Sequence, residues 1–329
     1  TAPVITLFAS DISVAFTDSL DIDLTVISHE SEYCDPAPVV TFADVTVAGA
    51  CPQEYTITRT WTATDACGNS TSCVQTITVD DSTAPVITLC AADITVECDE
   101  STDPSNTGEA TAMDNCDVSL DVSYTDSEEP GSCPQEKVIT RTWYTDDCNG
   151  NDAECVQIIT VVDTTPPVID VAASNQTVEC DGSGNEAQLN AWLADNGGAE
   201  ASDNCGDITW TNNFTVLSDG CGATGSAIVI FTATDDCGNS SSTTATFTIV
   251  DTTDPSIDVS ASDETVECDG MGNTAALAEW LASNGGASAS DDCGGIFWSN
   301  DFSGFSDDCG ATGSTMVTFT AQDECGNTS

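Results

Sequence analysis

Acidic side chains recur at fixed places along this 329-residue chain, where they could supply oxygen ligands to a hard cation. They follow a Glu-Cys pair, precede a Cys-Gly-Asn phrase, occupy short linkers and begin an Asp-Asn-Cys phrase. Calcium takes six to eight such oxygens, and extracellular modules bind it at about 10⁻⁴–10⁻³ M. We therefore predict calcium as the cofactor. The candidate ligands are Asp65, Asn69, Asp81, Asp99, Asp114, Asp163, Asp181, Asp203, Asp235, Asn239, Asp251, Asp269, Asp291 and Asp323. The alternative is that these residues only form turns and cap strands.

The charge balance excludes several classes of partner. The net charge is −53, from 56 acidic residues against the three basic residues Arg59, Lys137 and Arg141. Nucleic acids and anionic membrane surfaces both require clustered Lys and Arg. No apolar run approaches the length of a membrane span, so we expect no direct membrane insertion in this segment.

Catalytic chemistry has little support. His29 is the one histidine, and no Ser/His/Asp or Cys/His arrangement recurs. Paired carboxylates could hydrolyse glycosides, but here they recur in every repeat, which is unusual for an active site. We predict no catalytic residue, no organic cofactor site and no enzymatic activity.

Two phrases recur about every 81 to 88 residues. The entry phrase begins at Thr1, Thr83, Thr165 and Thr253, and the exit phrase surrounds a cysteine that is mostly followed by Gly-Asn. This period is too long for a solenoid repeat and suits a β-sandwich. We predict four modules, spanning residues 1–81, 82–163, 164–251 and 252–329.

Short Val, Ile, Thr and aromatic runs alternate in polarity, as expected of half-buried strands. Residues 55–63, 138–144 and 227–233 are clear cases. They predict an all-β fold of four tandem immunoglobulin-like β-sandwich modules, joined end to end in a rod by short Pro-containing linkers. Module 4 stops before its last expected strand, so either the sequence is a window of a longer array or a neighbouring chain supplies that strand.

The last two modules carry an insertion. Leu189, Trp192 and Leu193 follow helical spacing, and Asn-Gly closes the segment. We expect short helices at about 185–196 and 273–284, packed by their tryptophans against the sandwich edge. In the first two modules, Arg59 and Arg141 each lie two residues before a tryptophan, which favours a structural ion pair or stacking contact.

The 18 cysteines predict disulfides rather than metal ligation, because no Cys/His set with metal-ligand spacing recurs. Comparison of the modules favours pairing within each module. The predicted bonds are Cys51–Cys67, Cys34–Cys73, Cys98–Cys116, Cys133–Cys148, Cys90–Cys155, Cys180–Cys205, Cys221–Cys237, Cys268–Cys293 and Cys309–Cys325. A rival set for module 2 is 90–98 with 116–155. Phe8 and Phe16 replace two of the cysteines in module 1, so Cys34 and Cys73 could also both be free.

Several phrases together resemble four-cysteine HYR-like repeats. These are Thr-Val-Glu-Cys-Asp at 95–99, 177–181 and 265–269, Asp-Asn-Cys at 114–116 and 203–205, and the exit and linker phrases. Such repeats occur in large surface proteins of Bacteroidota, including gliding-motility-associated adhesins. The resemblance implies an immunoglobulin-like sandwich, export and surface adhesion or filament formation, and it supplies no catalytic residue.

The leading functional hypothesis is a secreted or cell-surface structural or adhesive fibre or stalk, whose partners are further copies or repeats of the same protein. The alternative is a ligand-binding module array that uses the inserted helix and Trp210 or Trp298 on surface glycans. A third possibility is a spacer of an enzyme whose catalytic domain lies elsewhere. Buried tryptophans would argue against the glycan platform.

Overall fold

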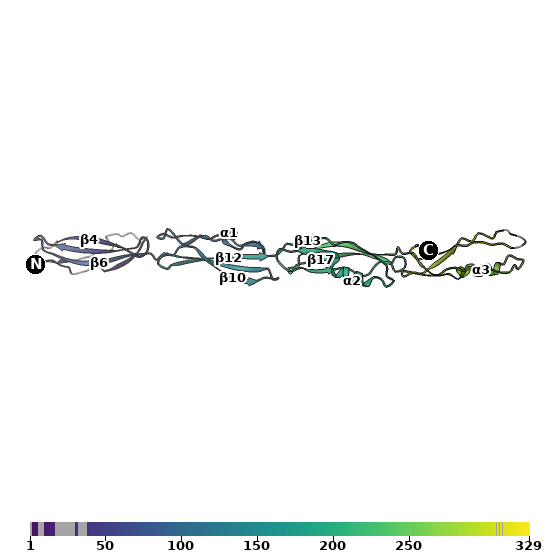
Figure 1. Ribbon diagram of the computed structural model, residues 1–329. Helices are drawn as coiled ribbons and strands as arrows, with labels where there is room; N and C mark the ends of the chain where they lie inside the picture. The colour runs from purple at the N-terminus through teal and green to yellow at the C-terminus, as the bar shows by residue number, and fades with distance from the viewer. Residues whose placement is uncertain are drawn as a thin grey trace. The chain divides into compact units, whose positions relative to one another are not determined.

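The computed structural model describes residues 2–5, 10–16, 30–31, 38–306, 308, 310 and 312–329. The chain divides into two compact units, Thr1–Val162 and Asp163–Ser329. Both units consist mainly of β-strands (Figure 1), so the fold is all-β, as predicted. The division falls within one residue of the predicted boundary between modules 2 and 3. All of the module boundaries stay predictions.

The first unit contains one sheet arrangement twice. In the first copy the strand order is β2-β6-β5-β4, with β2 parallel to β6 and the other neighbours antiparallel. The second copy has the order β8-β12-β11-β10 with the same directions. Two-stranded sheets, β1-β3 and β7-β9, complete these immunoglobulin-like sandwiches. The elements are β1 (Val4–Ile5), β2 (Ile12–Ala15), β3 (Glu30–Ser31), β4 (Val39–Ala48), β5 (Tyr55–Thr64), β6 (Ser70–Asp80), β7 (Val86–Leu89), β8 (Ile94–Glu97), α1 (Pro104–Thr107), β9 (Thr111–Met113), β10 (Ser123–Pro130), β11 (Lys137–Asp146) and β12 (Asp152–Val162).

The second unit repeats the pattern and adds helices. Its first sheet has the order β14-β18-β17-β16, beside the pair β13-β15. The following repeat contributes the pairs β19-β20 and β21-β22, and no counterpart of β18 occurs among its described residues. The elements are β13 (Val168–Val171), β14 (Gln176–Glu179), α2 (Glu186–Ala194), β15 (Glu200–Ser202), β16 (Thr209–Asn212), β17 (Gly225–Thr234), β18 (Ser240–Val250), β19 (Ser256–Val259), α3 (Thr274–Ala282), β20 (Ser288–Ser290), β21 (Phe297–Asn300) and β22 (Phe319–Gln322).

The strand sequences explain the cores. Side chains alternate between the two faces of a strand, so every second residue of β5 points inward. These inward residues include Ile57, Trp61 and Ala63, all buried. The intervening residues are mostly threonines, which suit a half-buried strand.

Two arginines interrupt this apolar pattern at equivalent positions. Arg59 and Arg141 are 7% and 2% exposed, and each makes a two-pronged ion pair, with Asp44 and Asp126. Each guanidinium also lies 4.3 Å from the ring centroid of the aromatic residue on the neighbouring strand. The predicted ion pair and stacking contact are both confirmed.

The predicted helices are confirmed as α2 and α3. Each begins after an Asn in the left-handed conformation, Asn185 (φ 54°) and Asn273 (φ 51°), a region that asparagine tolerates well. Asn185 is fully buried, and its side-chain amide donates to the Glu179 carbonyl. The next left-handed pair, Asn196-Gly197, follows the end of α2, as the Asn-Gly signal predicts.

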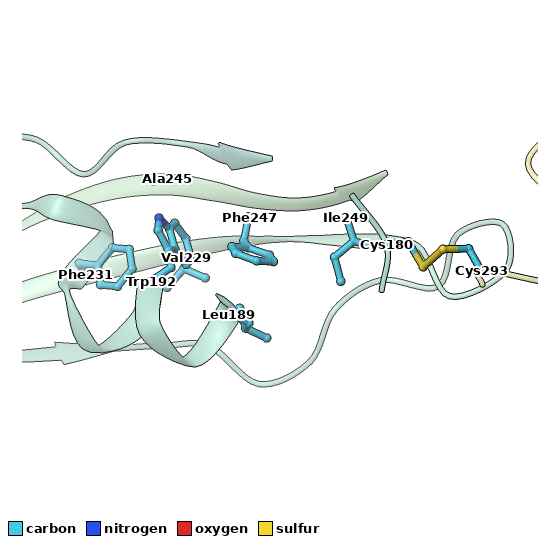
Figure 2. Packing of buried hydrophobic residues seen from close by; sticks show 9 residues of the cluster. All are labelled: Cys180, Leu189, Trp192, Val229, Phe231, Ala245, Phe247, Ile249 and Cys293. Atoms are coloured by element: carbon cyan, nitrogen blue, oxygen red, sulfur yellow. A yellow bond between two sulfur atoms is a disulfide. The ribbon is translucent and has the colours of Figure 1, made fainter. Parts of the chain in front are cut away.

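The core of the second unit gathers around Trp192 on α2 (Figure 2). Its ring centroid lies 5.1 Å from that of Phe231 and 5.4 Å from that of Phe247, and its indole N–H donates to the Ser174 carbonyl. The equivalent Trp280 on α3 keeps one aromatic contact, with Phe319. It is only partly buried, because the described part of its repeat has no strand in the place of β18.

Replacing Trp192 with Ala should destabilise the third repeat by about 3–5 kcal/mol, because it leaves a cavity between two phenylalanines and strips the Ser174 carbonyl of its donor. Trp280→Ala is the matched control and should lower the free energy of unfolding by clearly less. Calorimetric unfolding of the whole chain measures both variants. Equal losses would contradict this account of the core.

Candidate cation sites at the repeat junctions

Three aspartates from separate segments converge at the start of the second unit. Asp163 comes from the linker, Asp203 from the Asp-Asn-Cys phrase and Asp235 from the exit loop after β17. Carboxylate oxygens of the three lie within 4.8 Å of one another. Asp163 and Asp235 are each only 5% exposed.

Backbone donors orient the carboxylates of Asp203 and Asp235 and use only one oxygen of each. Asp235 Oδ1 accepts the N–H groups of Cys237 and Asn239 at 2.9 Å, and Asp203 Oδ1 accepts that of Cys205 at 2.8 Å. The Oδ2 atoms of Asp203 and Asp235 are buried without any hydrogen-bond partner. Buried polar atoms are normally satisfied, so these two oxygens are available to a further donor or to a cation.

A second such cluster lies further along the same unit. Oxygens of Asp251 and Asp291 lie within 4.8 Å of each other and of the Cys293 sulfur, and Asp251 Oδ2 is buried without a partner. Burial, together with the charges of Asp291, Asp323 and Glu179, raises the pKa of Asp251 above its ordinary value. The Asn327 amide donates to the Asp251 carbonyl and ties the exit loop to the linker.

The first unit has the equivalent cluster of Asp81, Asp114 and Cys116. Asp114 Oδ2 is buried and unpartnered. The exit-loop Asp147, 6% exposed, accepts N–H groups from Asn149 and Asn151, whose side-chain amides both donate to the Asp81 carbonyl.

The chain has no basic side chain to neutralise these clusters. Arg59, Arg141 and Lys137 are each paired elsewhere, with Asp44, Asp126 and Glu128. Two like charges about 5 Å apart repel by about 3 kcal/mol at an effective dielectric constant of about 20. A bound cation would remove this repulsion and supply the missing partner of the unsatisfied oxygens.

The donor atoms favour a hard cation. Cys293 is in a disulfide, so it offers no thiolate. Burial, and then the charge of Asp81, raises the pKa of Cys116 to about 11, so its thiol stays protonated at neutral pH. The remaining donors are carboxylate and carbonyl oxygens, which suit calcium better than zinc.

The other predicted ligands have turn-forming contacts. Asp65 accepts from the N–H groups of Cys67 and Asn69 and from the Asn69 amide. Asn239 donates its amide to the Asp163 carbonyl. Asp181 and Asp269 accept N–H groups from the loops before α2 and α3, and Asp99 is exposed in the turn after β8. Their part in metal binding stays a prediction.

The sequence comparison missed Asp147, Glu54 and Glu179. In the second module the cysteine comes one residue earlier in the exit loop, so an alignment on the cysteines does not place Asp147 opposite Asp65. Its spacing to Gly150-Asn151 nevertheless equals that of Asp65 to Gly68-Asn69. Glu54 accepts from the Asn149 amide at 2.6 Å, and Glu179 accepts from Thr252 N–H at 2.7 Å. Each glutamate thus joins one repeat to the segment that follows it.

Disulfides also join neighbouring repeats within each unit. In the first unit, Cys51 bonds to Cys148. In the second, Cys180 bonds to Cys293 and Cys221 to Cys325. Cys90–Cys155 lies within one repeat, as the sequence comparison expected. Cys98, Cys133, Cys205 and Cys237 are disulfide-bonded as well.

The pairing within modules was otherwise mostly wrong. The bonds above contradict Cys51–Cys67, Cys133–Cys148, Cys180–Cys205, Cys221–Cys237, Cys268–Cys293 and Cys309–Cys325, and the rival set 90–98 with 116–155. Cys116 and Cys73 are free and buried, which contradicts Cys98–Cys116 and Cys34–Cys73. Cys34 and Cys309 themselves lie outside the described residues, as do Phe8 and His29.

The way in which neighbouring repeats pair their cysteines explains why Cys73 and Cys116 are free. Cys180–Cys293 joins the first cysteine of one repeat to the second of the next. By that rule Cys116 would pair with the position that Phe16 occupies in the first module. Cys73 corresponds to Cys155, whose partner Cys90 aligns with Phe8. Each phenylalanine therefore removes one bond.

Close backbone packing supports the junction in the second unit. The Ala223 N–H donates to the Cys293 carbonyl at 2.8 Å. A Cβ on the preceding Gly222, which has φ 55°, would lie 1.9 Å from the same oxygen. Only glycine fits this approach, which explains the Cys-Gly-Ala phrase.

The predicted aromatic platform is not prominent in this repeat. Trp210 on β16 is partly buried and packs against the core of Phe231, Phe247 and Trp192. This placement argues against a flat, exposed glycan-stacking surface at Trp210.

None of the helices in the part of the chain that the structure describes is long and apolar enough to cross a membrane.

Comparisons with known proteins add a limited match. No family model matches the chain. Hyalin of Strongylocentrotus purpuratus is 36% identical over 128 residues, which cover 37% of this chain and 10% of Hyalin. This similarity supports the likeness to HYR-like repeats. The chain thus spans only a small part of the length of Hyalin. Its disulfides are typical of extracellular proteins.

Solved structures of similar architecture include two cadherin-type proteins. The Protocadherin GammaB4 extracellular domain is 11% identical, with 79% of this chain and 51% of that chain covered and a TM-score of 0.28. Drosophila N-cadherin EC1-4 is 12% identical, with 97% of each chain covered and a TM-score of 0.25. Scores this low support no functional conclusion.

Peptide mapping without reduction tests the disulfide pattern. We expect linked peptides that contain Cys51 with Cys148, Cys180 with Cys293 and Cys221 with Cys325. Digestion in denaturant, with free thiols blocked first, prevents exchange. Linked peptides that contain Cys51 with Cys67 or Cys180 with Cys205 would contradict the pattern.

The glutamates that join the repeats predict acid sensitivity. Thr252 N–H, and then the Thr253 hydroxyl, lowers the pKa of Glu179, and the Asn149 amide lowers that of Glu54. A carboxylate with a lowered pKa contributes stability above its ordinary pKa, and loses it as pH falls through the lower, folded-state value. Glu179→Gln should therefore reduce stability at pH 7 and flatten its loss below about pH 4.3. The exposed Glu200→Gln should change neither, and thermal unfolding between pH 3 and pH 7 measures both.

Proposed function

We propose that this chain is part of a structural or adhesive extracellular fibre or stalk, built from disulfide-stapled repeats that calcium ions stiffen at their junctions. The observation that carries the proposal is the set of buried carboxylate oxygens without partners, those of Asp114, Asp203, Asp235 and Asp251. Asp114 and Asp203 occupy equivalent places in successive repeats, and Asp235 and Asp251 belong to the exit-loop and linker parts of clusters of the same kind. A recurrent site of this kind suits an architectural role better than catalysis.

Calcium would stiffen a junction because each cluster draws on separate segments. The linker supplies Asp163 or Asp251. The following repeat supplies the aspartate two residues before its second cysteine, Asp203 or Asp291, and the aspartate of its exit loop. A cation shared by these groups would fix the linker against the repeat that follows. Disulfides between repeats add covalent restraint to the same region.

The proposal includes a secreted or cell-surface location, partners that are further copies or repeats of the same protein, and no enzymatic activity. The Hyalin match and the disulfides support the adhesive class. Membership among Bacteroidota surface proteins is part of this proposal and rests on the sequence phrases. A glycan-binding array is less well supported, because Trp210 packs against the core.

Asp251→Asn tests the calcium sites through two effects of opposite sign. In chelator the variant should be more stable than the natural chain, because it removes a buried charge that its neighbours disfavour. When calcium is added, the stability of the variant should rise less than that of the natural chain. A site with a Kd of about 10⁻⁴–10⁻³ M should contribute about 1.4–2.7 kcal/mol at about 10 mM calcium.

Calorimetry with and without calcium measures both effects. The control Glu279→Gln removes one exposed charge from α3, in the repeat that follows the Asp251 linker, and should keep the full calcium gain. Equal calcium gains in the Asp251→Asn variant and the natural chain would contradict the proposed site. So would an equal response to magnesium.

A further inference from the structure

The disulfide between Cys221 and Cys325 shows how a turn of one repeat is joined to the exit loop of the next. Cys221 begins a Cys-Gly-Ala-Thr-Gly turn, and Cys325 lies in an Asp-x-Cys-Gly-Asn loop. Asp323 Oδ1 accepts the N–H groups of Cys325 and Asn327 at 2.8 and 2.9 Å, which fixes the loop. The Cys51–Cys148 bond joins a turn to an exit loop in the first unit in the same manner.

The exit loop of the first repeat has the same geometry. Asp65 Oδ1 accepts the N–H groups of Cys67 and Asn69 at 2.9 and 2.8 Å. The Asn69 amide donates to Asp65 Oδ2 at 2.8 Å, the same distance as between Asn327 and Asp323. Cys67 thus occupies the position that Cys325 uses for its bond between repeats.

Cys67 differs from Cys73 and Cys116 in its accessibility. Cys73 and Cys116 are buried, and burial raises the pKa of both thiols. Cys67 is free and exposed. An exposed thiol in a preformed loop can be reached by a cysteine of another repeat.

We propose that Cys67 is a covalent junction point that forms a disulfide with the first cysteine of a Cys-Gly-Ala-Thr-Gly turn in another repeat. That repeat would precede the first one in the same polypeptide or belong to a second copy. Within residues 1–329 this turn sequence occurs at Cys221, which is already bonded, and at Cys309. The proposal does not depend on calcium binding.

The reaction balances as an ordinary thiol oxidation. One S–S bond forms, two S–H bonds break, and two protons are released. The two electrons pass to a small-molecule disulfide such as oxidised glutathione, which becomes two thiols. Exchange proceeds through a mixed disulfide on one of the two cysteines.

Oxidation of the 329-residue chain in a glutathione buffer tests the proposal. We expect a ladder of dimers and higher species on non-reducing gels, collapsed by dithiothreitol. Peptide mapping should find Cys67 linked to Cys309. Cys67→Ser and Cys309→Ser should each lose at least about nine-tenths of the ladder. Cys73→Ala, which removes a buried thiol from the same repeat, should keep it.

The source of the partner is resolved by isotope labelling. In a mixture of light and nitrogen-15-labelled chains, mixed-label linked peptides identify a second copy. In protein isolated from its source, a link from Cys67 to a turn upstream in the same polypeptide identifies that source instead. The proposal is wrong if Cys67 is alkylated, glutathionylated or bonded within its own repeat in both materials.

Discussion

The disulfides between neighbouring repeats are the restraint on which the rest of each unit depends. A bond such as Cys180–Cys293 or Cys221–Cys325 fixes a turn of one repeat against a loop of the next, with Cα atoms 5.1 to 6.0 Å apart. That proximity brings the Cys293 carbonyl onto Ala223 N–H and leaves room only for glycine at position 222. The acidic clusters lie in these same segments. Asp291, for example, is two residues before the bonded Cys293.

The junctions combine two forces of opposite sign. Carboxylates gathered in one buried place repel one another, and no Lys or Arg offsets them. Covalent bonds oppose that repulsion, since they constrain the unfolded chain and hold the loops together. A cation bound there, as we propose, would offset the repulsion and let the surrounding medium set the stiffness of the junction.

The two units use different elements to bring a tryptophan into the core. In the first unit a strand tryptophan fills the core, and its indole N–H donates to a buried glutamine, as Trp143 does to Gln157. In the second unit the strand carries Phe231 instead, and a helix brings Trp192 over the same sheet. An aromatic core with a satisfied indole is kept in both, while the element that supplies it changes.

Local sequence patterns were enough to predict the strands, both helices, the arginine ion pairs and the recurring aspartates. These features depend on side-chain alternation, helical spacing and turn chemistry, all of which act over a few residues. The tertiary structure decided which cysteines pair and which carboxylates converge. Cys51 is 16 residues from Cys67 and 97 from Cys148, yet it bonds the distant one. Disulfide geometry depends on distance in space, which spacing along the chain does not determine.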